Sequence, residues 1–458
     1  MRHRGIKAAL AATAVLTGTG TALSQDAAGA LRFLFGVSTD LRAHDNLDLD
    51  PVSAGSTVRS DTTLTFGVQS ETRRQKLNLS FGGVLRAEDA PGTGFTTGFE
   101  NPNVGLSYIR DGANARLSFD ASFARTDVDG SSFLDPGTQR VKTDGIDLIS
   151  DTGSLDTLRA GVTLEIGKDA PLGFVLDLNR VDTSYSDTTD PGLFARTTDS
   201  ASATAVLRFS PVTEGRITAG ITQYSAQDAP LTTRDTQRLS FGVTHELSET
   251  TVIEASIGGR QIDDSVTGVT RSGEASFSVT HDLPRGSVGL SLDTGLTTAG
   301  QRNTVELQRR FEFPTGALEF SLGATDAEGI DPQPIGSLSY SRDLPRGAIT
   351  ATVSRSISVN SDANVQRRTG ATLGLSHMVN EQYSIAFNLD YTDFSDAGGG
   401  GVTDRQRGSF SASYTRALTQ DWNLTAGIER RYLAEAGSAD AWDNAVFLTL
   451  GRDFSLLR

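Results

Sequence analysis

The sequence predicts an all-β fold, a single antiparallel up-and-down transmembrane β-barrel of about 22 strands. Three observations carry this prediction: an alternating nonpolar pattern, its regular recurrence along the chain, and a short motif at the C-terminus. In Ser276-Phe277-Ser278-Val279-Thr280, as in many other runs, nonpolar residues are two apart. Successive side chains of a β-strand point to opposite faces, so each run forms a strand with one nonpolar and one polar face.

Eight of these runs end in the same way, with a basic residue, usually an acidic residue, and then a tight turn. The clearest copies continue as His281-Asp282-Leu283-Pro284-Arg285-Gly286 and Arg342-Asp343-Leu344-Pro345-Arg346-Gly347. A unit that recurs about every 30–40 residues and holds two strands is an array of β-hairpins. The basic residues of the eight copies are Arg110, Lys168, His245, His281, Arg342, His377, Arg416 and Arg452.

The two faces of these strands favour a membrane barrel over a soluble sandwich. The polar face carries small residues, such as Ser240, Gly242 and Thr244 in one strand. A β-sandwich needs large nonpolar residues on the inner faces of both sheets, which these strands do not supply. A transmembrane strand needs only ~9–11 residues, with nonpolar side chains toward lipid and polar side chains toward the lumen.

The chain divides into a secretory signal peptide, residues 1–24, and a transmembrane β-barrel domain, residues 25–458. Three basic residues, a nonpolar run over residues 8–16 and a stretch of small residues open the sequence. This order is typical of a signal peptide, and we expect cleavage before Gln25. Beyond the signal, no nonpolar run approaches the ~18 residues of a membrane helix.

The barrel strands follow from the connections, which alternate between short and long. Ten short connections lie at Glu71–Gln75, Asp111–Asn114, Asp169–Leu172, Ser210–Thr213, Leu247–Thr250, Leu283–Gly286, Phe313–Gly316, Leu344–Gly347, Val379–Gln382 and Leu418–Asp421. Eleven longer connections, rich in Asp, Gly and Thr, lie near residues 43–57, 87–102, 126–155, 184–200, 226–236, 262–270, 297–302, 325–334, 359–366, 394–405 and 433–442. Together they define twenty-two strands, an even number with the alternation typical of bacterial outer-membrane barrels, whose short turns face the periplasm.

The C-terminal residues carry a separate signal. Thr449-Leu450-Gly451-Arg452-Asp453-Phe454-Ser455-Leu456 has a polar residue, a glycine and then hydrophobic residues two apart beside an aromatic. This motif resembles the assembly signal of Gram-negative outer-membrane β-barrels and porins, although Leu457 and Arg458 follow it. The resemblance covers the whole mature chain. It implies an integral outer-membrane protein with both termini in the periplasm. The implied partners are outer-membrane lipids, lipopolysaccharide and, through the last strand, the barrel-assembly machinery.

From the predicted width of the barrel we expect a porin-like channel for passive diffusion of small or bulky polar solutes. Barrels of about 16–18 strands enclose aqueous channels, whereas 22-stranded transporters carry a plug in the lumen. Only about six residues separate Ser24 from the first predicted strand near Leu31, so the sequence predicts no plug. The alternatives are a conduit that exports a polymer such as polysaccharide, docked to a periplasmic partner, and a structural or surface-binding barrel with a closed lumen.

Because side chains alternate between the two faces of a strand, the recurrent basic and acidic residues are predicted to lie on opposite faces. His281 shares the lipid face with Val279, whereas Asp282 shares the lumen face with Thr280. The eight basic residues are therefore candidates for binding lipid head groups at the periplasmic rim, where a cation avoids the hydrocarbon. Candidate carboxylates of the periplasmic mouth, which either favour cations or are simply solvated, are Asp111, Asp169, Glu246, Asp282, Asp343 and Asp453.

Other charges on the predicted lumen face have both signs, and we expect them to stabilise the wall through cross-strand pairs or to create a transverse field. The acidic ones are Asp120, Asp177, Glu254, Asp293, Glu319, Asp390 and Glu429, and the basic ones are Arg86, Arg116, Arg260, Arg310, Arg407 and Arg431. Arg309 falls on the lipid face, between Leu307 and Phe311, where only a bulge or a register error would explain it.

The longest connection, residues 126–155, has three open interpretations. It is a solvated loop, a loop that folds into the lumen and narrows it, or a Ca²⁺ site built on Asp127-Val128-Asp129-Gly130. The Ca²⁺ site is disfavoured because the rest of a 12-residue loop with a bidentate Glu is missing. In some porins the third outer loop constricts the pore, and this is also the third outer loop here.

Composition excludes several classes of function. Without the signal the chain has 38 basic against 56 acidic residues, a net charge of −18, which argues against nucleic acid as a partner. It has no cysteine, and no nucleophile elbow or P-loop is present, so we expect no enzyme, no cofactor and no metal site. His44, the one histidine in an outer loop, is flanked by Asp40 and Asp45 and is interpreted as a surface residue.

Overall fold

The computed structural model describes residues 31–128, 153–359, 364–398 and 404–457. The predicted signal, residues 1–24, and most of the 126–155 connection, with its three interpretations, lie outside the described residues. Within the described part of the chain, no helix is long and nonpolar enough to cross a membrane.

Twenty-two strands form the structure, which confirms the predicted number. In chain order they are β1 (Leu31–His44), β2 (Thr57–Glu71), β3 (Gln75–Ala90), β4 (Gly94–Asp111), β5 (Ala115–Asp127), β6 (Ser154–Ile166), β7 (Leu172–Ser186), β8 (Arg196–Ser210), β9 (Thr213–Ala226), β10 (Thr233–Ser248), β11 (Thr251–Asp264), β12 (Gly268–Leu283), β13 (Gly286–Thr297), β14 (Gly300–Phe313), β15 (Gly316–Ala327), β16 (Ile330–Leu344), β17 (Gly347–Val359), β18 (Val365–Met378), β19 (Tyr383–Asp396), β20 (Arg405–Ala417), β21 (Trp422–Glu435) and β22 (Ala441–Leu457).

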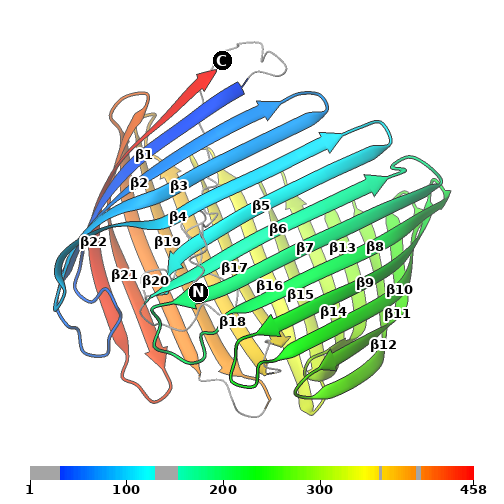
Figure 1. The fold of residues 1–458 in the computed structure, drawn as a ribbon. Helices are drawn as coiled ribbons and strands as arrows, with labels where there is room; N and C mark the ends of the chain where they lie inside the picture. Colours follow the sequence, from blue (N-terminus) through cyan, green and yellow to red (C-terminus); the bar gives the residue numbers. More distant parts are fainter. Residues whose placement is uncertain (1–30, 129–152, 360–363, 399–403, 458) are drawn as a thin grey trace, which may run out of the picture.

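The sheet closes into a barrel (Figure 1). Each strand pairs antiparallel with the next one along the chain, and β1 pairs with β22 from Arg32↔Leu457 to His44↔Ala445. The closed antiparallel up-and-down barrel is therefore confirmed. The ten connections predicted to be short lie at one end of the barrel, which we call the turn rim, and the eleven others lie at the opposite end, the loop rim. Two connections of the loop rim, between β13 and β14 and between β15 and β16, are also only two residues long.

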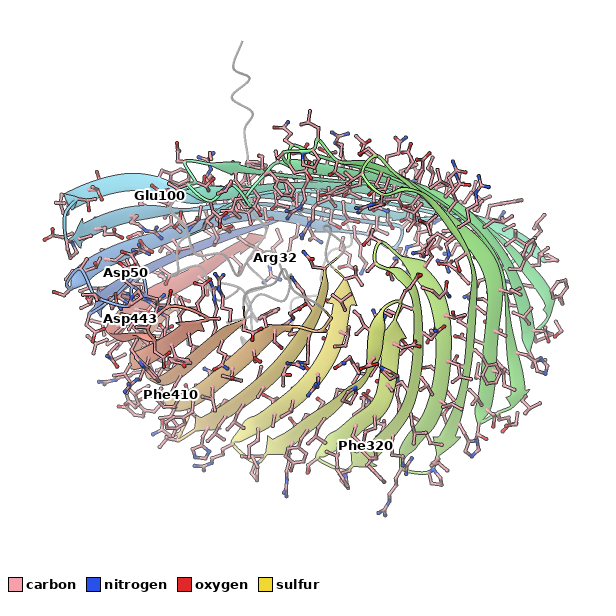
Figure 2. All side chains as sticks on the ribbon, turned by 90° about the horizontal axis from the view of Figure 1, so that it is seen from below. Arg32, Asp50, Glu100, Phe320, Phe410 and Asp443 are labelled. Atoms are coloured by element: carbon pink, nitrogen blue, oxygen red, sulfur yellow. The ribbon has the colours of Figure 1, made fainter. Side chains whose placement is uncertain are left out.

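The outer face of the wall is nonpolar and the inner face is polar. On β10, Leu239, Phe241 and Val243 are 49%, 51% and 48% exposed, although they are large hydrophobic residues. Figure 2 looks along the barrel and places Phe320 and Phe410 on the outside of the wall. Inward hydroxyls instead bond across strands. An exposed nonpolar surface that runs around a closed barrel needs lipid as its solvent.

Aromatic rings and arginines meet on the outer face near the turn rim. The Arg452 guanidinium lies 5.3 Å from the centre of the Trp422 ring and 4.2 Å from that of Phe454. Arg416 lies 5.5 Å from the centre of the Tyr383 ring. Aromatic and basic residues at one depth are typical of the boundary between membrane hydrocarbon and water.

Arg309 belongs to the same kind of arrangement. The pairing of β14 with β13 and with β15 is continuous through Arg309, so the suggested bulge or register error is wrong. Its guanidinium lies 4.1 Å from the centre of the Phe311 ring, and Nη1 donates a hydrogen bond to the Ser287 carbonyl at 2.9 Å. The cation–π contact and the hydrogen bond offset part of the cost of placing a cation on the outer face.

One strand glycine is required by the close approach of a neighbouring backbone. A Cβ atom on Gly323 would lie 2.2 Å from the Val305 carbonyl oxygen, so β14 would have to move. We expect Gly323→Ala to destabilise the barrel by about 1–3 kcal/mol. The measurement is the temperature at which the folded barrel converts to the slower-migrating unfolded form on an electrophoretic gel.

Gly220→Ala is the matched control for this substitution. Its Cβ atom would meet Ala201 and Ser202 at 3.5 and 3.6 Å, which is ordinary van der Waals contact. The control should unfold close to the temperature of the unchanged protein, and an equal loss in both variants would contradict the steric explanation.

Candidate functional site

The carboxylates and cations predicted at the periplasmic mouth lie near the turn rim, in short connections or toward the ends of strands. Asp282 and Asp343 are next to last in β12 and β16, and Asp169 lies between β6 and β7. His245 Nδ1 lies 2.9 Å from a neighbouring threonine hydroxyl, and His281 Nδ1 lies 2.8 Å from another. Their binding of lipid or of cations stays a prediction.

The alternation of side chains along the strand does not predict the position of Lys168 correctly. Alternation along the strands predicts that Lys168 and Asp111 lie on opposite faces, but the two side chains form an ion pair. Lys168 follows Gly167, which has a left-handed backbone with φ +73°, so the alternation of the strand has already ended there. Asp111 is the last residue of β4, and it reaches the neighbouring connection directly.

Asp169 and Glu246 line one cavity of about 540 Å³ at the turn rim. The cavity has three further charged residues that were not predicted from the sequence, Arg208, Glu214 and Arg216. Glu214 accepts a hydrogen bond from Arg216 at 2.8 Å and lies 3.5 Å from Arg208. The cavity therefore carries charges of both signs rather than carboxylates alone.

The most deeply buried side chain is that of Asp443 on β22, which is 0% exposed. Its Oδ2 lies 2.9 Å from His44 Nδ1 and accepts a hydrogen bond from Arg431 Nε at 2.8 Å. Its Oδ1 accepts a hydrogen bond from the backbone N–H of Asn46 at 3.1 Å. We call these four residues the seam cluster, because they join β21 and β22 to β1 and the first loop. Figure 2 places Asp443 near Asp50 of that loop.

The seam cluster fixes the first loop against the barrel wall. Arg431 Nη2 donates a hydrogen bond to the Leu47 carbonyl at 2.7 Å. Leu49 packs with Leu433 and Ala441 in a small buried hydrophobic core. Because Arg431 and Leu433 lie on the inward face of β21, the first loop packs on the inner wall. This inward loop was not predicted from the sequence.

His44 is not the surface residue that the sequence analysis described. Its side chain is only 5% exposed, and it faces the buried carboxylate of Asp443. The two residues are 399 positions apart, so only the pairing of β1 with β22 brings them together. By contrast, Arg431 and Asp443 face each other across one hairpin, and register counting across its connection would have found that pair.

Carboxylates outnumber guanidinium groups in two further clusters near the loop rim. These are Asp40–Arg42–Glu429, with N–O distances of 2.7 and 2.6 Å, and Asp61–Arg86–Asp127, with N–O distances of 2.9 and 2.6 Å. Arg86 pairs with carboxylates of β2 and β5, and Glu429 of β21 pairs with Arg42 of β1, which confirms the expected cross-strand pairing for Arg86 and Glu429. Asp40 and Arg42 lie on the same strand. In each cluster one arginine neutralises only one of two carboxylates.

In one cluster on β10, β11 and β12 the balance is reversed, and three arginines face two carboxylates. Glu274 lies 2.8 Å from Arg238 and 2.7 Å from Arg260, and Asp264 lies 2.7 Å from Arg234. We call these five residues the arginine patch. Its formal charge is one positive unit, on a chain that is acidic overall.

Asp264 is the last residue of β11 and lies at the loop rim, outside the membrane-spanning part of the strand. Burial raises the pKa of its carboxyl group, but hydrogen bonds from the backbone of Val266 and Thr267 and from Arg234 outweigh burial. Together they hold the pKa below the usual range for Asp. The carboxylate therefore stays charged and keeps Arg234 in place in mildly acidic solution.

Among the described residues, no group of three or more His, Asp or Glu side chains is placed to hold a metal ion. The charged clusters described above consist of ion pairs.

The closed wall and its nonpolar outer face define an outer-membrane type of β-barrel. No protein-family model matches the chain, and no curated protein matches it significantly. Solved structures do match. The siderophore receptor PirA from Pseudomonas aeruginosa has a TM-score of 0.54 and 11% identity, over 93% of this chain and 80% of that one. The FrpB iron transporter from Neisseria meningitidis has a TM-score of 0.58 and 11% identity, over 94% and 82%.

A ferric enterobactin receptor, PfeA from Pseudomonas aeruginosa, is similar to the same extent. Its TM-score is 0.57 at 12% identity, over 93% of this chain and 81% of that one. Identities this low show a shared fold and nothing finer. The shared feature is the 22-stranded wall.

These likenesses overturn the expectation of a porin-like channel for passive diffusion. The named structures that share the wall are receptors and an iron transporter. Lumen width was the physical argument for a porin, and width alone does not separate a diffusion channel from a transporter of the same strand number. The polymer-export conduit and the closed structural barrel are set aside with it.

The seam cluster leads to a prediction about stability. Asp443→Asn keeps the shape of the side chain but removes the charge that faces Arg431, which is 3% exposed. Removing one partner of a buried ion pair costs about 3–5 kcal/mol, because the other charge is left uncompensated. We expect a lower unfolding temperature in the gel assay described above.

Asp421→Asn is the control. It removes a carboxylate from an ion pair with Arg452 in which Asp421 is 52% exposed. Exposed pairs contribute roughly 0–1 kcal/mol, so this variant should unfold nearly as the unchanged protein does. Equal losses in the two variants would show that the seam cluster has no special role.

Proposed function

We propose that this barrel is an outer-membrane receptor that takes up a bulky anionic ligand of the iron-chelate class. The observation that carries the proposal is the likeness of its wall, over more than nine-tenths of the chain, to siderophore receptors and an iron transporter. The proposed role is transport without a catalytic step. The described residues form the wall and its connections, and no plug domain is among them.

The charge of the inner wall supports an anionic ligand. Iron chelates present carboxylate or phenolate oxygens around the metal, and many of these complexes are negatively charged. The arginine patch is the place on the described inner wall where three guanidinium groups meet two carboxylates. Elsewhere near the loop rim the acidic clusters would repel an anion. A ligand entering at this rim would therefore be directed toward β10–β12.

The proposal also includes the placement of the barrel in the membrane. The turn rim and both termini would face the periplasm, and the loop rim would face outward. The outward cations near the turn rim, such as Arg342, would then lie at lipid head groups, and the candidate carboxylates would lie at the periplasmic mouth. The last strand, β22, would present its C-terminal motif to the assembly machinery before it pairs with β1.

Uptake measurements test the proposed function. Cells that lack their own iron-chelate receptors and express this chain should accumulate radioactive iron from ferric catecholate or ferric hydroxycarboxylate chelates. The rate should saturate with chelate concentration, because a receptor has a limited number of binding sites. Cells with the empty vector are the control. Uptake that rises linearly with concentration for every chelate would contradict a receptor.

Cysteine labelling tests the placement in the membrane. Leu344→Cys places a thiol at the turn-rim end of β16, and Ser438→Cys places one in a loop-rim connection. In intact cells an impermeant thiol reagent should modify the second variant and leave the first unmodified, because the membrane shields the periplasmic side. The natural chain contains no cysteine and serves as the blank. The opposite labelling pattern would show that the barrel is inverted.

A further inference from the structure

A cavity of about 260 Å³ lies near the loop rim, between the inner face of β8–β11 and the tip of the β13–β14 hairpin. The wall contributes Thr198, Thr222, Tyr224, Arg234, Thr236 and Arg260. These residues are neighbours in the strand register, since Tyr224 pairs with Thr198 and with Arg234 and Thr222 pairs with Thr236. They therefore form one continuous patch on one face of four adjacent strands.

The hairpin tip covers this patch because β13 separates from β12 before the loop rim. Pairing of β12 with β13 begins at Ala275↔Thr294, whereas β12 remains paired with β11 as far as Gly268. The released tip packs against the wall. Leu296 is 2% exposed, and its carbonyl accepts a hydrogen bond from Arg260 Nη1 at 2.9 Å. The cavity thus lies between two layers of the chain.

Three threonine hydroxyl groups of the cavity are available to a ligand. The hydroxyl groups of Thr198, Thr222 and Thr236 make no side-chain hydrogen bond to any other described residue. The Arg234 guanidinium lies 5.2 Å from the centre of the Tyr224 ring, which adds a flat nonpolar surface. Pockets that bind small molecules combine such a surface with a few convergent polar groups.

The charge of the cavity favours negatively charged ligands among those that are rich in oxygen. Arg234 and Arg260 line it directly, and their carboxylate partners, Asp264 and Glu274, are also held by other donors. The five residues of the arginine patch, which include Arg238 outside the cavity, have a formal charge of one positive unit. A singly charged anion would neutralise this excess, and the three hydroxyl groups would pair with hydroxyl groups of the ligand.

We propose that this cavity binds a hydroxylated carboxylate, either as a free sugar-acid type of ligand or as the hydroxycarboxylate group of a larger chelate. The second form rests on the function proposed above, whereas the binding site itself does not. The carboxylate would lie at Arg234 and Arg260, and the hydroxyl groups would lie at the threonines. The size of the cavity suits one ring or one short chain rather than a whole chelate.

Calorimetric titration of the full chain in detergent tests the site. The probe is D-galacturonate, and D-galactose is the neutral ligand of the same ring size. We expect saturable binding of galacturonate and about tenfold weaker binding of galactose, because a hydrogen bond to a charged group is worth about 1.5–3 kcal/mol. Arg260→Gln should weaken galacturonate binding about tenfold, and Thr222→Val about fivefold.

Two matched variants control for changes of charge and of hydroxyl content elsewhere on the wall. Arg310→Gln, in an ion pair on β14, and Thr280→Val, on β12, lie outside the cavity and should bind as the unchanged protein does. If Arg260→Gln does not fold, Thr222→Val decides the question. Absence of saturable binding, or equal binding by the cavity and control variants, would overturn the site.

The calorimetric test of the cavity and the uptake test of the receptor can give different results, and each result bears on only one of the two proposals. Binding of galacturonate without uptake of any iron chelate would support the cavity and reject the proposed receptor. Uptake of a catecholate chelate by a protein that does not bind galacturonate would support the receptor and reject the cavity.

Discussion

The pairing of β1 with β22 is the constraint on which the rest of the structure depends. Within hydrocarbon, an unpaired backbone N–H or C=O group has no water to bond to, and each one costs several kcal/mol. The sheet must therefore close, and thirteen residue pairs from Arg32↔Leu457 to His44↔Ala445 close it. Closure explains why the chain has an even number of strands and why its first and last strands begin and end at the same rim. It also brings residues 399 positions apart into contact.

The seam cluster is a direct result of that closure. His44, Arg431 and Asp443 lie on three neighbouring strands, but one of those strands is the first of the chain and the other two are the last. A buried ion pair of this kind adds little net stability, because burial costs nearly as much as the attraction returns. Its effect is on conformation. The hydrogen bonds to Asn46 and Leu47 select one position for the first loop, so the shape of the lumen near this rim depends on it.

The outer face is mostly a nonpolar surface for lipid, apart from cations such as Arg309 and Arg452, so the proposed ligand would meet the inner wall. The wall is a single sheet, so each strand side chain points either to lipid or to the lumen. Polar side chains that are unfavourable in lipid therefore point mostly to the lumen. Within that wall the balance of charge varies. Arg42 and Arg86 each face two carboxylates, whereas Glu274 faces two arginines. This local difference, rather than net charge, bears on what a ligand meets inside the barrel.

The sequence by itself determined the strand number, the two faces and the location of the short turns, because alternation and turn residues are local properties of the chain. It also placed Arg260 and Arg431 on the inner face. Only the tertiary structure decided their partners and the burial of His44. The tip of the β13–β14 hairpin covers Arg260 because β12 and β13 stop pairing before the loop rim, which the sequence did not predict. The alternation of side chains along a strand predicts the face on which a residue lies, but not which residue lies beside it. The alternation stops where the strand stops, so the prediction fails at Lys168. Strand number sets the width of a barrel, and width is shared by channels and transporters, so width alone did not support the expected porin-like channel.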